Sequence, residues 1–423
     1  MEVHVSGKSD VGRVRSVNED NHLVCWPVLP GVGVFVVADG VGGAKHGEVA
    51  SDMFVQEVGR RVMRSGQEFS YYDITSARVT REKLLSMLSS IIKQTNRRIF
   101  GLSQQDPELE GMCTTGVVMV LANDGVFLAH AGDSRCYLIR GGQIHQLTHD
   151  HTLANQLISN GLLDASQLED FPFSHVITRS FGSKSSVEFD TLFLESAPGD
   201  RFVLCTDGLH NHMTPEEVMQ ESLRFQDPEM LVDRLIAEAN ARGGKDNITV
   251  VVIDKASATF EAETAILTLE RKLDVMRRLF LFMELNDEEL MRVMQIVYSM
   301  RKSRGEIIIR EGASGNEFFI VIEGLVDISL EGRYLTSIAP GGHFGEMALI
   351  DDHFRSATAT AKTDVVLLTI QRDDFQTLLE TEGDMVKKLL FCFLGNLAGR
   401  VRDLSCEMVE LNEELSVLKR KPQ

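Results

Sequence analysis

Two apolar runs of this sequence end in the same dipeptide, and this repetition constrains the fold more than any other feature. Residues 34–38 (VFVVA) lead into Asp39, residues 202–206 (FVLCT) lead into Asp207, and a glycine follows each aspartate. Short apolar runs predict strands buried on both faces, so each aspartate is expected where a buried strand ends. Asp-Gly is also a common turn dipeptide, and either pair alone would indicate a plain turn.

Further acidic residues lie beside other predicted strands, namely Glu19, Asp20, Asp133 and Asp246. Carboxylates that converge in a buried place lose hydration and repel one another unless a cation joins them. Oxygen ligands of this kind select magnesium or manganese over zinc or copper. Two such ions activate water as a nucleophile and hold a phosphoryl oxygen. The sequence therefore predicts a metal site that hydrolyses a phosphoester.

The chain is too long for one hydrophobic core, because its 423 residues exceed the roughly 250–300 at which single cores stop growing. Residues 1–254 alternate apolar runs with helical patterns and end in a strand-like run. Residues 255–280 have apolar residues at helical spacing, which predicts a helical connector. Residues 281–384 carry short strand-like runs separated by glycine turns, which predicts a second, mostly β domain.

Residues 385–423 predict a long C-terminal helix with a dimer seam. Apolar residues recur there at alternating spacings of four and three, which is a heptad pattern; they are Leu390, Leu394, Leu397, Val401, Leu404, Met408, Leu411, Leu415 and Leu418. The alternative is one amphipathic helix that lies on its own domain. Because the pattern persists over about four heptads, we expect a coiled coil that forms a homodimer.

Composition excludes several classes of function. The formal net charge of -19 opposes the phosphate backbone of nucleic acids. No segment approaches the roughly 18 uninterrupted apolar residues of a membrane helix, and no signal peptide precedes the first motif. The six cysteines are scattered, with no Cys-x-x-Cys pair. We therefore expect a soluble, cytoplasmic protein with free thiols and no zinc site.

Six short motifs occur within residues 1–254: VRSVNEDN at 14–21, ADGVGG at 38–43, TTG at 114–116, AGDSR at 131–135, LTHDH at 147–151 and GGKDN at 243–247. In this order they resemble the protein phosphatase 2C family, especially its bacterial members. The resemblance implies an α+β fold, with a central sandwich of two antiparallel sheets flanked by helices. It also implies a metal-dependent phosphatase that acts on phosphoserine or phosphothreonine in proteins.

The resemblance implies metal ligands that match the acidic residues. A first manganese or magnesium ion takes Asp39, Asp207 and Asp246. A second takes Glu19, Asp39 and the Gly40 carbonyl. Asp20 is expected to bind through water, and Asp133, together with Asp207, matches the carboxylates of a weaker third metal.

Arg15 lies where the family places its phosphate-binding arginine, and a planar guanidinium suits two phosphate oxygens. A plain surface arginine is the alternative. The sequence departs from eukaryotic members at Val41, where those enzymes carry a histidine proposed as general acid. His46 is a candidate substitute, or a solvated loop histidine. Residues 151–177 match the family's flap over the site, which shapes the choice of protein substrate.

The segment FGEMALI at 344–350 is followed by RSAT at 355–358. A glycine lets the backbone approach a ligand, a short helix start presents amides to an anion, and an arginine neutralises a phosphate. Together these features resemble the phosphate-binding cassette of the cyclic-nucleotide-binding domain, as in the catabolite activator protein. The resemblance spans about residues 280–419 and implies a β-roll that binds cAMP or cGMP.

The same resemblance implies roles for the residues of the cassette. Arg355 holds the cyclic phosphate, and Ser356 adds a hydroxyl to it. Glu346 accepts a hydrogen bond from the ribose 2′-hydroxyl. The amides near Gly345, Met347 and Ala348 complete the cradle.

Three functions follow from these patterns. The first is a protein phosphatase regulated by a cyclic nucleotide. The second is a nucleotide-responsive module that binds a phosphoprotein without turnover, against which the intact acidic residues argue. The third is a constitutive phosphatase whose nucleotide fold only dimerises, against which Glu346 and Arg355 argue.

Overall fold

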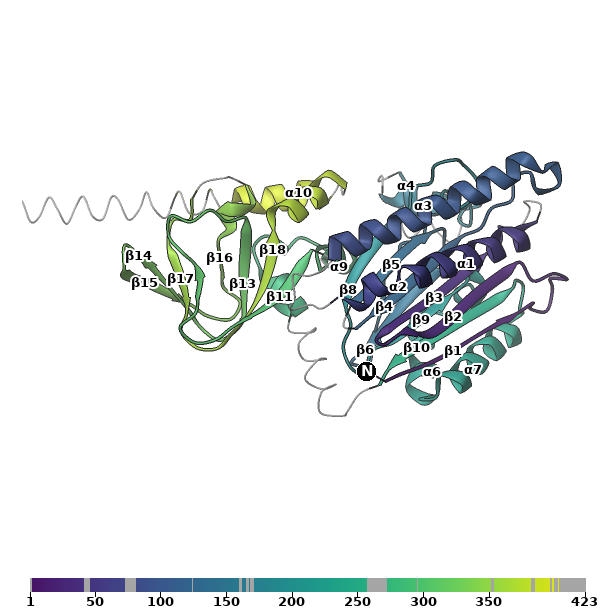
Figure 1. Ribbon diagram of the computed structural model, residues 1–423, viewed down its shortest axis with the longest axis horizontal. Helices are drawn as coiled ribbons and strands as arrows, with labels where there is room; N and C mark the ends of the chain where they lie inside the picture. The colour runs from purple at the N-terminus through teal and green to yellow at the C-terminus, as the bar shows by residue number, and fades with distance from the viewer. Residues whose placement is uncertain are drawn as a thin grey trace, which may run out of the picture. The chain divides into compact units, whose positions relative to one another are not determined.

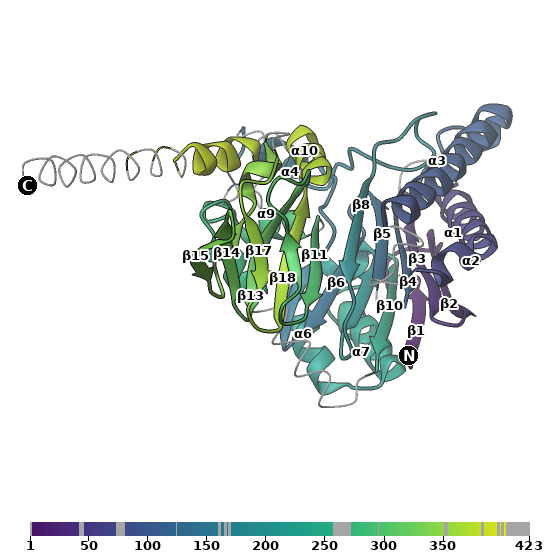
Figure 2. The ribbon, with the colours of Figure 1, turned by 60° about the vertical axis from the view of Figure 1, so that its left-hand side comes forward.

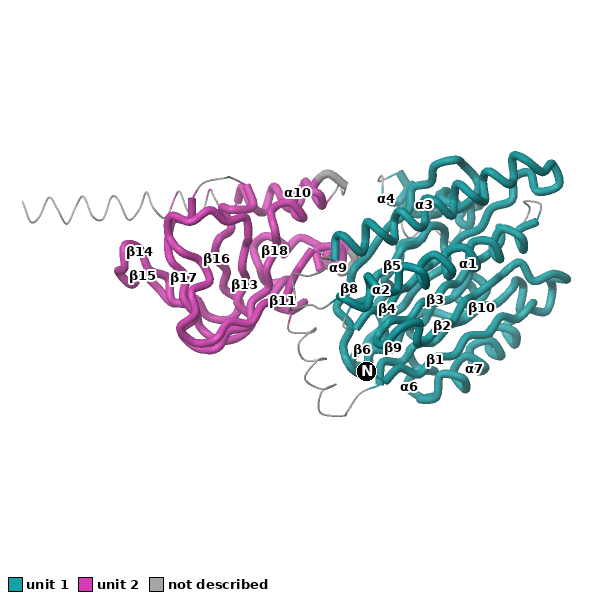
Figure 3. The backbone as a smooth tube through the Cα atoms, in the orientation of Figure 1, with its two compact units in different colours: residues 1–266 teal, residues 267–423 magenta. Residues whose placement is uncertain are grey.

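The computed structural model describes residues 2–41, 46–72, 81–123, 125–159, 162–164, 167, 171–256, 272–294, 296–350, 354–381, 385–395, 398 and 402. The chain divides into two compact units, residues 1–266 and residues 267–423 (Figure 3). Most of the predicted connector lies outside the described residues. Its last part, residues 272–278, is helical, as the apolar spacing predicts.

The strands described in the first unit form two antiparallel sheets, ordered β1-β10-β9-β6-β7 and β2-β3-β4-β5-β8. Their bounds are β1 Val3–Asp10, β2 Asp20–Leu29, β3 Val32–Asp39, β4 Gly116–Ala122, β5 Gly125–Ala131, β6 Arg135–Arg140, β7 Gln143–Gln146, β8 Asp190–Glu195, β9 Arg201–Cys205 and β10 Ile248–Lys255.

Helices cover the outer face of each sheet (Figures 1 and 2). One set consists of α1 Gly47–Arg64, α2 Gly66–Ser70 and α3 Arg81–Gln105, and the other of α6 Pro215–Arg224 and α7 Pro228–Ala241. Shorter turns are η1 Pro107–Leu109, α4 Leu153–Ser159 and α5 Asp207–His210. The unit therefore has four layers, helix, sheet, sheet and helix, and the predicted α+β sandwich is confirmed.

The apolar run of β3 explains these layers. Val34 and Val36 point into the core beneath α1 and α3, whereas Phe35 and Val37 point into the core between the sheets. All four side chains are fully buried, because successive side chains of a strand alternate between two covered faces. Asp39 is the last residue of this strand and lies at the edge of both cores.

The second unit contains two four-stranded antiparallel sheets, ordered β11-β18-β13-β16 and β12-β17-β14-β15. The strands are β11 Val297–Lys302, β12 Ile307–Ile309, β13 Glu317–Glu323, β14 Val326–Leu330, β15 Arg333–Ile338, β16 His343–Phe344, β17 Thr358–Ala361 and β18 Val365–Gln371. Besides the helical residues 272–278 and 385–395, the unit contains α9 Asp287–Met294, η3 Glu346–Leu349 and α10 Arg372–Thr381. The predicted second β domain is confirmed.

The C-terminal helix has two apolar faces where it is described, at residues 385–395. Leu389 and Phe393 are buried in the core of the second unit, so this part of the helix lies on its own domain. Leu390 and Leu394, the first two positions of the predicted heptads, are 47% and 60% exposed. The other heptad positions lie outside the described residues, and the coiled coil stays a prediction.

The cysteines in the described part of the chain carry free thiols, and Cys113, Cys136 and Cys205 are buried. This agrees with the expectation of scattered, unpaired cysteines. None of the helices in that part is both long enough and apolar enough to span a membrane.

Candidate functional site

Five aspartates lie where strands of both sheets begin or end. Asp20 begins β2 and stands opposite Asp39, the last residue of β3. Asp207 follows β9, Asp246 precedes β10, and Asp133 follows β5. Burial raises the pKa of Asp39 well above its ordinary value, and the charges of Asp20, Asp207, Asp133 and Asp246 add to that rise. The acidic residues singled out in the sequence thus lie within electrostatic range of one another.

The glycines that follow Asp39 and Asp207 allow another backbone segment to pack closely against them. A Cβ at Gly40 would lie 2.4 Å from the carbonyl carbon of Gly47, and a Cβ at Gly208 would lie 1.9 Å from the Asn247 carbonyl oxygen. Neither glycine has a positive φ angle. Each Asp-Gly pair therefore brings a second backbone segment against the carboxylates, which a plain turn does not require.

Asp20 is held by two threonines that the sequence analysis did not single out. Its Oδ2 accepts hydrogen bonds from Thr206 Oγ1 at 2.8 Å and from Thr249 Oγ1 at 2.7 Å. Burial nevertheless raises the pKa of Asp20 to about 7. Thr249 carries a buried hydroxyl in an otherwise apolar run. A polar residue at such a position was the sequence feature from which a role at the site could have been predicted.

Three buried carboxylate oxygens have no hydrogen-bond partner among the described residues: Asp20 Oδ1, Asp133 Oδ1 and Asp207 Oδ1. Burial, with the charge of Asp207, raises the pKa of Asp133 to about 7. Burial and then Asp246 raise the pKa of Asp207. Buried oxygens are normally paired, and unpaired oxygens in this number fit the ligand set of hard divalent cations. The residues present therefore fit magnesium or manganese.

Arg15 lies beside the carboxylates. Its Nη2 donates to Asp246 Oδ2 at 2.8 Å, and both side chains are partly exposed. Glu19 is positioned by its backbone amide, which donates to Asn247 Oδ1 at 2.8 Å. Burial raises the pKa of the Glu19 carboxyl, and Arg15 opposes that rise. The predicted phosphate-binding arginine and the predicted metal ligands are thus at one site.

His46 and His175 are two of the histidines near this site. His46 has a left-handed backbone with φ of 62°, and its Nδ1 is 3.2 Å from Glu48 Oε1. His175 follows α4 in the segment predicted as the flap, and its charge lowers the pKa of Asp207 against the larger effect of burial. His175 is therefore within electrostatic range of the carboxylates, although no pattern in the sequence indicated this.

Arg355 is the centre of the second candidate site. Its side chain is buried, and Nη2 donates to Glu317 Oε2 at 2.9 Å. Nη1 is buried and has no partner among the described residues. Added Cβ atoms at Gly315 and Gly345 would lie 2.6 Å from Arg355 Nε and 2.9 Å from Arg355 Nη1, so the two glycines leave room for the guanidinium. A buried donor without an acceptor is destabilising, so this part of Arg355 fits an anion that the protein itself does not supply.

The rest of the cassette surrounds η3. Gly345 precedes this turn with φ of 79°, and the Ala348 amide donates to the Gly345 carbonyl at 3.1 Å. Glu346 is buried, whereas Met347 and Ser356 are exposed. The structure therefore places the predicted nucleotide-binding residues together, and it adds Glu317, which the sequence analysis missed.

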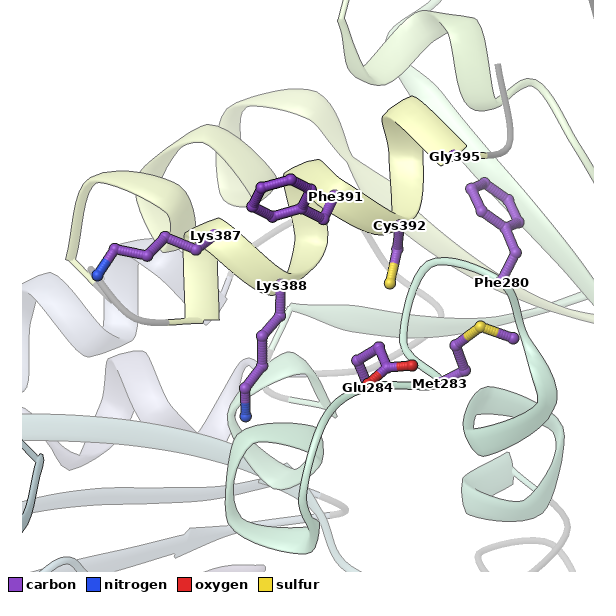
Figure 4. Close-up of a pocket in the computed structure, with 8 residues that line it drawn as sticks. All are labelled: Phe280, Met283, Glu284, Lys387, Lys388, Phe391, Cys392 and Gly395. Atoms are coloured by element: carbon purple, nitrogen blue, oxygen red, sulfur yellow. The ribbon is translucent and has the colours of Figure 1, made fainter. Parts of the chain in front are cut away.

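A separate pocket of about 560 Å³ lies in the second unit between residues 280–284 and the C-terminal helix (Figure 4). Phe280 and Met283 line one wall, and Phe391 and Cys392 line the other. None of the predicted nucleotide-binding residues lines it. The pocket is distinct from the cassette, and its lining combines these side chains with the charged side chains of Glu284, Lys387 and Lys388.

Two family models match the chain. The model described as Protein phosphatase 2C matches residues 11–235, and the model described as Cyclic nucleotide-binding domain matches residues 300–382. The first covers the elements that carry Glu19, Asp20, Asp39, Asp133 and Asp207, and it ends before Asp246. The second covers β13, η3 and the segment that contains Arg355.

Individual relatives agree with the first match. The chain is similar to the serine/threonine phosphatase stp of Listeria monocytogenes serotype 4b, with 34% identity over 60% of this chain and 96% of the relative. The structure is similar to that of the S. agalactiae serine/threonine phosphatase, with 30% identity, a TM-score of 0.53, and coverage of 60% of this chain and 99% of the other. It is also similar to the catalytic domain of the phosphatase PstP in complex with two manganese ions, with 30% identity, a TM-score of 0.50, and coverage of 60% and 99%.

Proposed function

The chain belongs to the protein phosphatase 2C family, and we propose that a cyclic nucleotide bound to its second domain regulates phosphatase activity in its first. It is a metal-dependent serine/threonine protein phosphatase. The catalytic part of this proposal rests on the cluster of buried, unpaired carboxylate oxygens at Asp20, Asp133 and Asp207. The regulatory part of the proposal rests on the unpaired Nη1 of Arg355.

We assign the acidic residues to metals as follows. Asp39, Asp207 and Asp246 hold one ion, and Glu19, Asp39 and the Gly40 carbonyl hold a second. Asp20 acts through water, and Asp133 with Asp207 holds a weaker third ion. Divalent cations held by such ligands activate water and stabilise negative charge on phosphoryl oxygens.

The remaining residues orient the substrate and the ligands. Arg15 is assigned to the phosphate of the substrate, because its guanidinium lies beside the cluster and is only partly buried. Thr206 and Thr249 fix the Asp20 carboxylate by two hydrogen bonds. These contacts hold the acidic site in place before substrate binds, which is what positioning of a reactive centre requires.

The nucleotide site is assigned to Arg355, with Glu346 for the ribose hydroxyl. A cyclic nucleotide carries one negative charge, and a buried guanidinium with an open donor suits it. Gly345, Met347, Ala348 and Ser356 complete the assignment. The ligand is cAMP or cGMP, since the phosphate and ribose contacts are common to both.

We also propose the domain boundaries along the chain: a phosphatase domain at 1–254, a connector at 255–280, a nucleotide-binding domain at 281–384 and a dimerisation helix at 385–423. The two compact units support the main boundary. Exposed Leu390 and Leu394 support a homodimer through the helix, because they continue the heptad pattern on the face that the domain leaves uncovered. Free, partly buried thiols support a reducing, cytoplasmic location.

Turnover of p-nitrophenyl phosphate tests the catalytic proposal. Wild-type protein should hydrolyse it with added manganese and lose activity in excess chelator. Asp39→Ala should abolish turnover and leave the circular dichroism spectrum unchanged, because removal of one crowded carboxylate relieves repulsion. Full activity of Asp39→Ala, or of the wild type in chelator, would reject the assigned site. Addition of cAMP and cGMP in turn tests regulation.

A further inference from the structure

Large apolar side chains are exposed in two segments of the first unit. Ten such side chains are exposed among its described residues, and six of them lie in these segments. The six are Val11, Val14, Val17, Leu162, Phe173 and Val176. Single exposed apolar residues are ordinary on a protein surface, but their concentration beside a site indicates a binding surface.

The first segment is fixed against the carboxylate cluster. Asn247 Nδ2 donates to the carbonyls of Val11 and Val17 at 3.0 Å each. Between these two anchors lies Arg15, whose guanidinium donates to Asp246. Val14 and Val17, which are 69% and 55% exposed, therefore flank the arginine assigned to the phosphate.

The second segment reaches the cluster from the flap. The Leu153 amide donates to the Val176 carbonyl at 2.8 Å, which ties this segment to α4. Phe173 and Val176 are 57% and 45% exposed. Two residues after Val176, the Thr178 amide donates to the His151 carbonyl at 2.8 Å, and the His151 amide donates at 2.9 Å to the carbonyl of Gly132, the residue before Asp133. This segment therefore also presents apolar side chains next to the catalytic carboxylates.

We propose that Val14, Val17, Phe173 and Val176 form an apolar rim that contacts the residues flanking the phosphorylated serine or threonine. The occupant is the phosphorylated segment of the substrate protein, because Val14 and Val17 flank Arg15, and hydrogen bonds link the second segment through His151 to the loop before Asp133. Preferred substrates carry aliphatic or aromatic residues beside the phosphoresidue. This inference rests on the proposed function and names the class of substrate for the same site.

The test compares two synthetic phosphothreonine peptides of equal length and charge. One carries leucine on both sides of the phosphothreonine, and the other carries serine. For the wild type with manganese, kcat/KM should be about tenfold higher for the leucine peptide, mainly through KM, because buried apolar area contributes to binding. The ratio of the two kcat/KM values is the readout, since it does not depend on the fraction of active enzyme.

Val14→Ser and Phe173→Ser should each bring the ratio towards one. Leu223→Ser is the control and should leave the ratio unchanged. Leu223 is comparably exposed, at 53%, but it lies away from the site. Its neighbour Ser222 accepts a hydrogen bond from Arg201, which is at the opposite end of β9 from Asp207. A wild-type ratio near one overturns the inference, as does a preference that survives in both rim variants. Hydrolysis of p-nitrophenyl phosphate is measured alongside. If that activity is absent, the proposed function itself fails.

Discussion

Arg355 donates from Nη2 to Glu317 Oε2 at 2.9 Å, so the arginine assigned to the cyclic phosphate is already paired with a carboxylate of its own domain. Glu317 is the first residue of β13, and its side chain is one third exposed. An incoming cyclic phosphate therefore meets both the positive charge of Arg355 and the negative charge of Glu317. The pair holds the guanidinium in place and also competes with the ligand.

Glu317→Gln should bind cyclic nucleotide more tightly than the wild type, by about three- to tenfold. Glutamine retains an oxygen that accepts from Arg355, so the guanidinium stays in position, while the negative charge opposite the phosphate is removed. Isothermal titration calorimetry with cAMP and with cGMP measures the change. Glu323→Gln, at the other end of β13, is the matched control. Weaker binding by Glu317→Gln would mean that the charge of Glu317 is needed to hold Arg355.

The metal-free protein should lose stability as the pH rises. Asp20 and Asp133 have pKa values of about 7 in the folded protein against an ordinary value of 3.8. Between these values the folded chain binds more protons than the unfolded chain, so the free energy of unfolding decreases with increasing pH. Manganese binds the ionised carboxylates and should reverse the loss at neutral and higher pH.

Thermal unfolding measures this effect at a pH of about 5 and of about 8, in chelator and in manganese. Buried His130 and His210, with pKa values lowered to about 4, act in the opposite direction, since their stabilisation is lost as the pH falls below the ordinary value of 6.5. The variant Asp133→Asn separates the two contributions, because it should flatten the pH dependence in chelator. Asp106→Asn, at an exposed aspartate, should not. If the thermal stability of Asp133→Asn in chelator depends on pH as strongly as that of the wild type, the prediction is wrong.

The fold was predictable where the sequence pattern is local. The fully apolar run of β3 and its terminal Asp39 identify a strand with two covered faces, and the structure agrees. The same holds for β9, which ends two residues before Asp207, and for β10, which begins two residues after Asp246. In each case the apolar run that predicts the strand and the aspartate at the site lie within a few residues of each other.

The partners of the site residues were not predictable, because they come from distant parts of the chain. Thr206 and Thr249 lie 186 and 229 residues from Asp20, and Glu317 lies 38 residues from Arg355. A hydroxyl or a carboxylate that begins or interrupts an apolar strand shows that it needs a partner. Only the packing of the sheets shows which partner it has.

Removal of the C-terminal helix after residue 395 should convert a dimer into a monomer without unfolding the second unit. This position keeps Leu389 and Phe393, which are part of the hydrophobic core, and removes the heptad positions from Leu397 onward. Multi-angle light scattering measures the mass, and calorimetry checks that the nucleotide domain still unfolds cooperatively. A truncated protein that remains dimeric would move the interface away from the predicted coiled coil.

Arg355→Ala should remove the effect of cyclic nucleotide on phosphatase rate. Loss of a charge-assisted contact in a buried site costs about 2–5 kcal/mol of binding, so the ligand dissociates at ordinary concentrations. A ligand shifts an equilibrium only through its different affinities for the two states, and a weaker contact must therefore weaken the switch. The readout is the ratio of rates with and without saturating nucleotide, measured together with nucleotide affinity.

Arg355→Lys supplies the decisive comparison. Lysine keeps the positive charge but has neither the planar fork nor the length to replace both Nη1 and Nη2. If the open Nη1 binds the phosphate, Arg355→Lys should show intermediate affinity and recover the rate change only at higher nucleotide concentration. Wild-type rates that are equal with and without nucleotide, despite measurable binding, would instead assign the second domain to dimerisation or localisation. The regulatory proposal would then be wrong, while the carboxylate site of the first domain would keep its assignment.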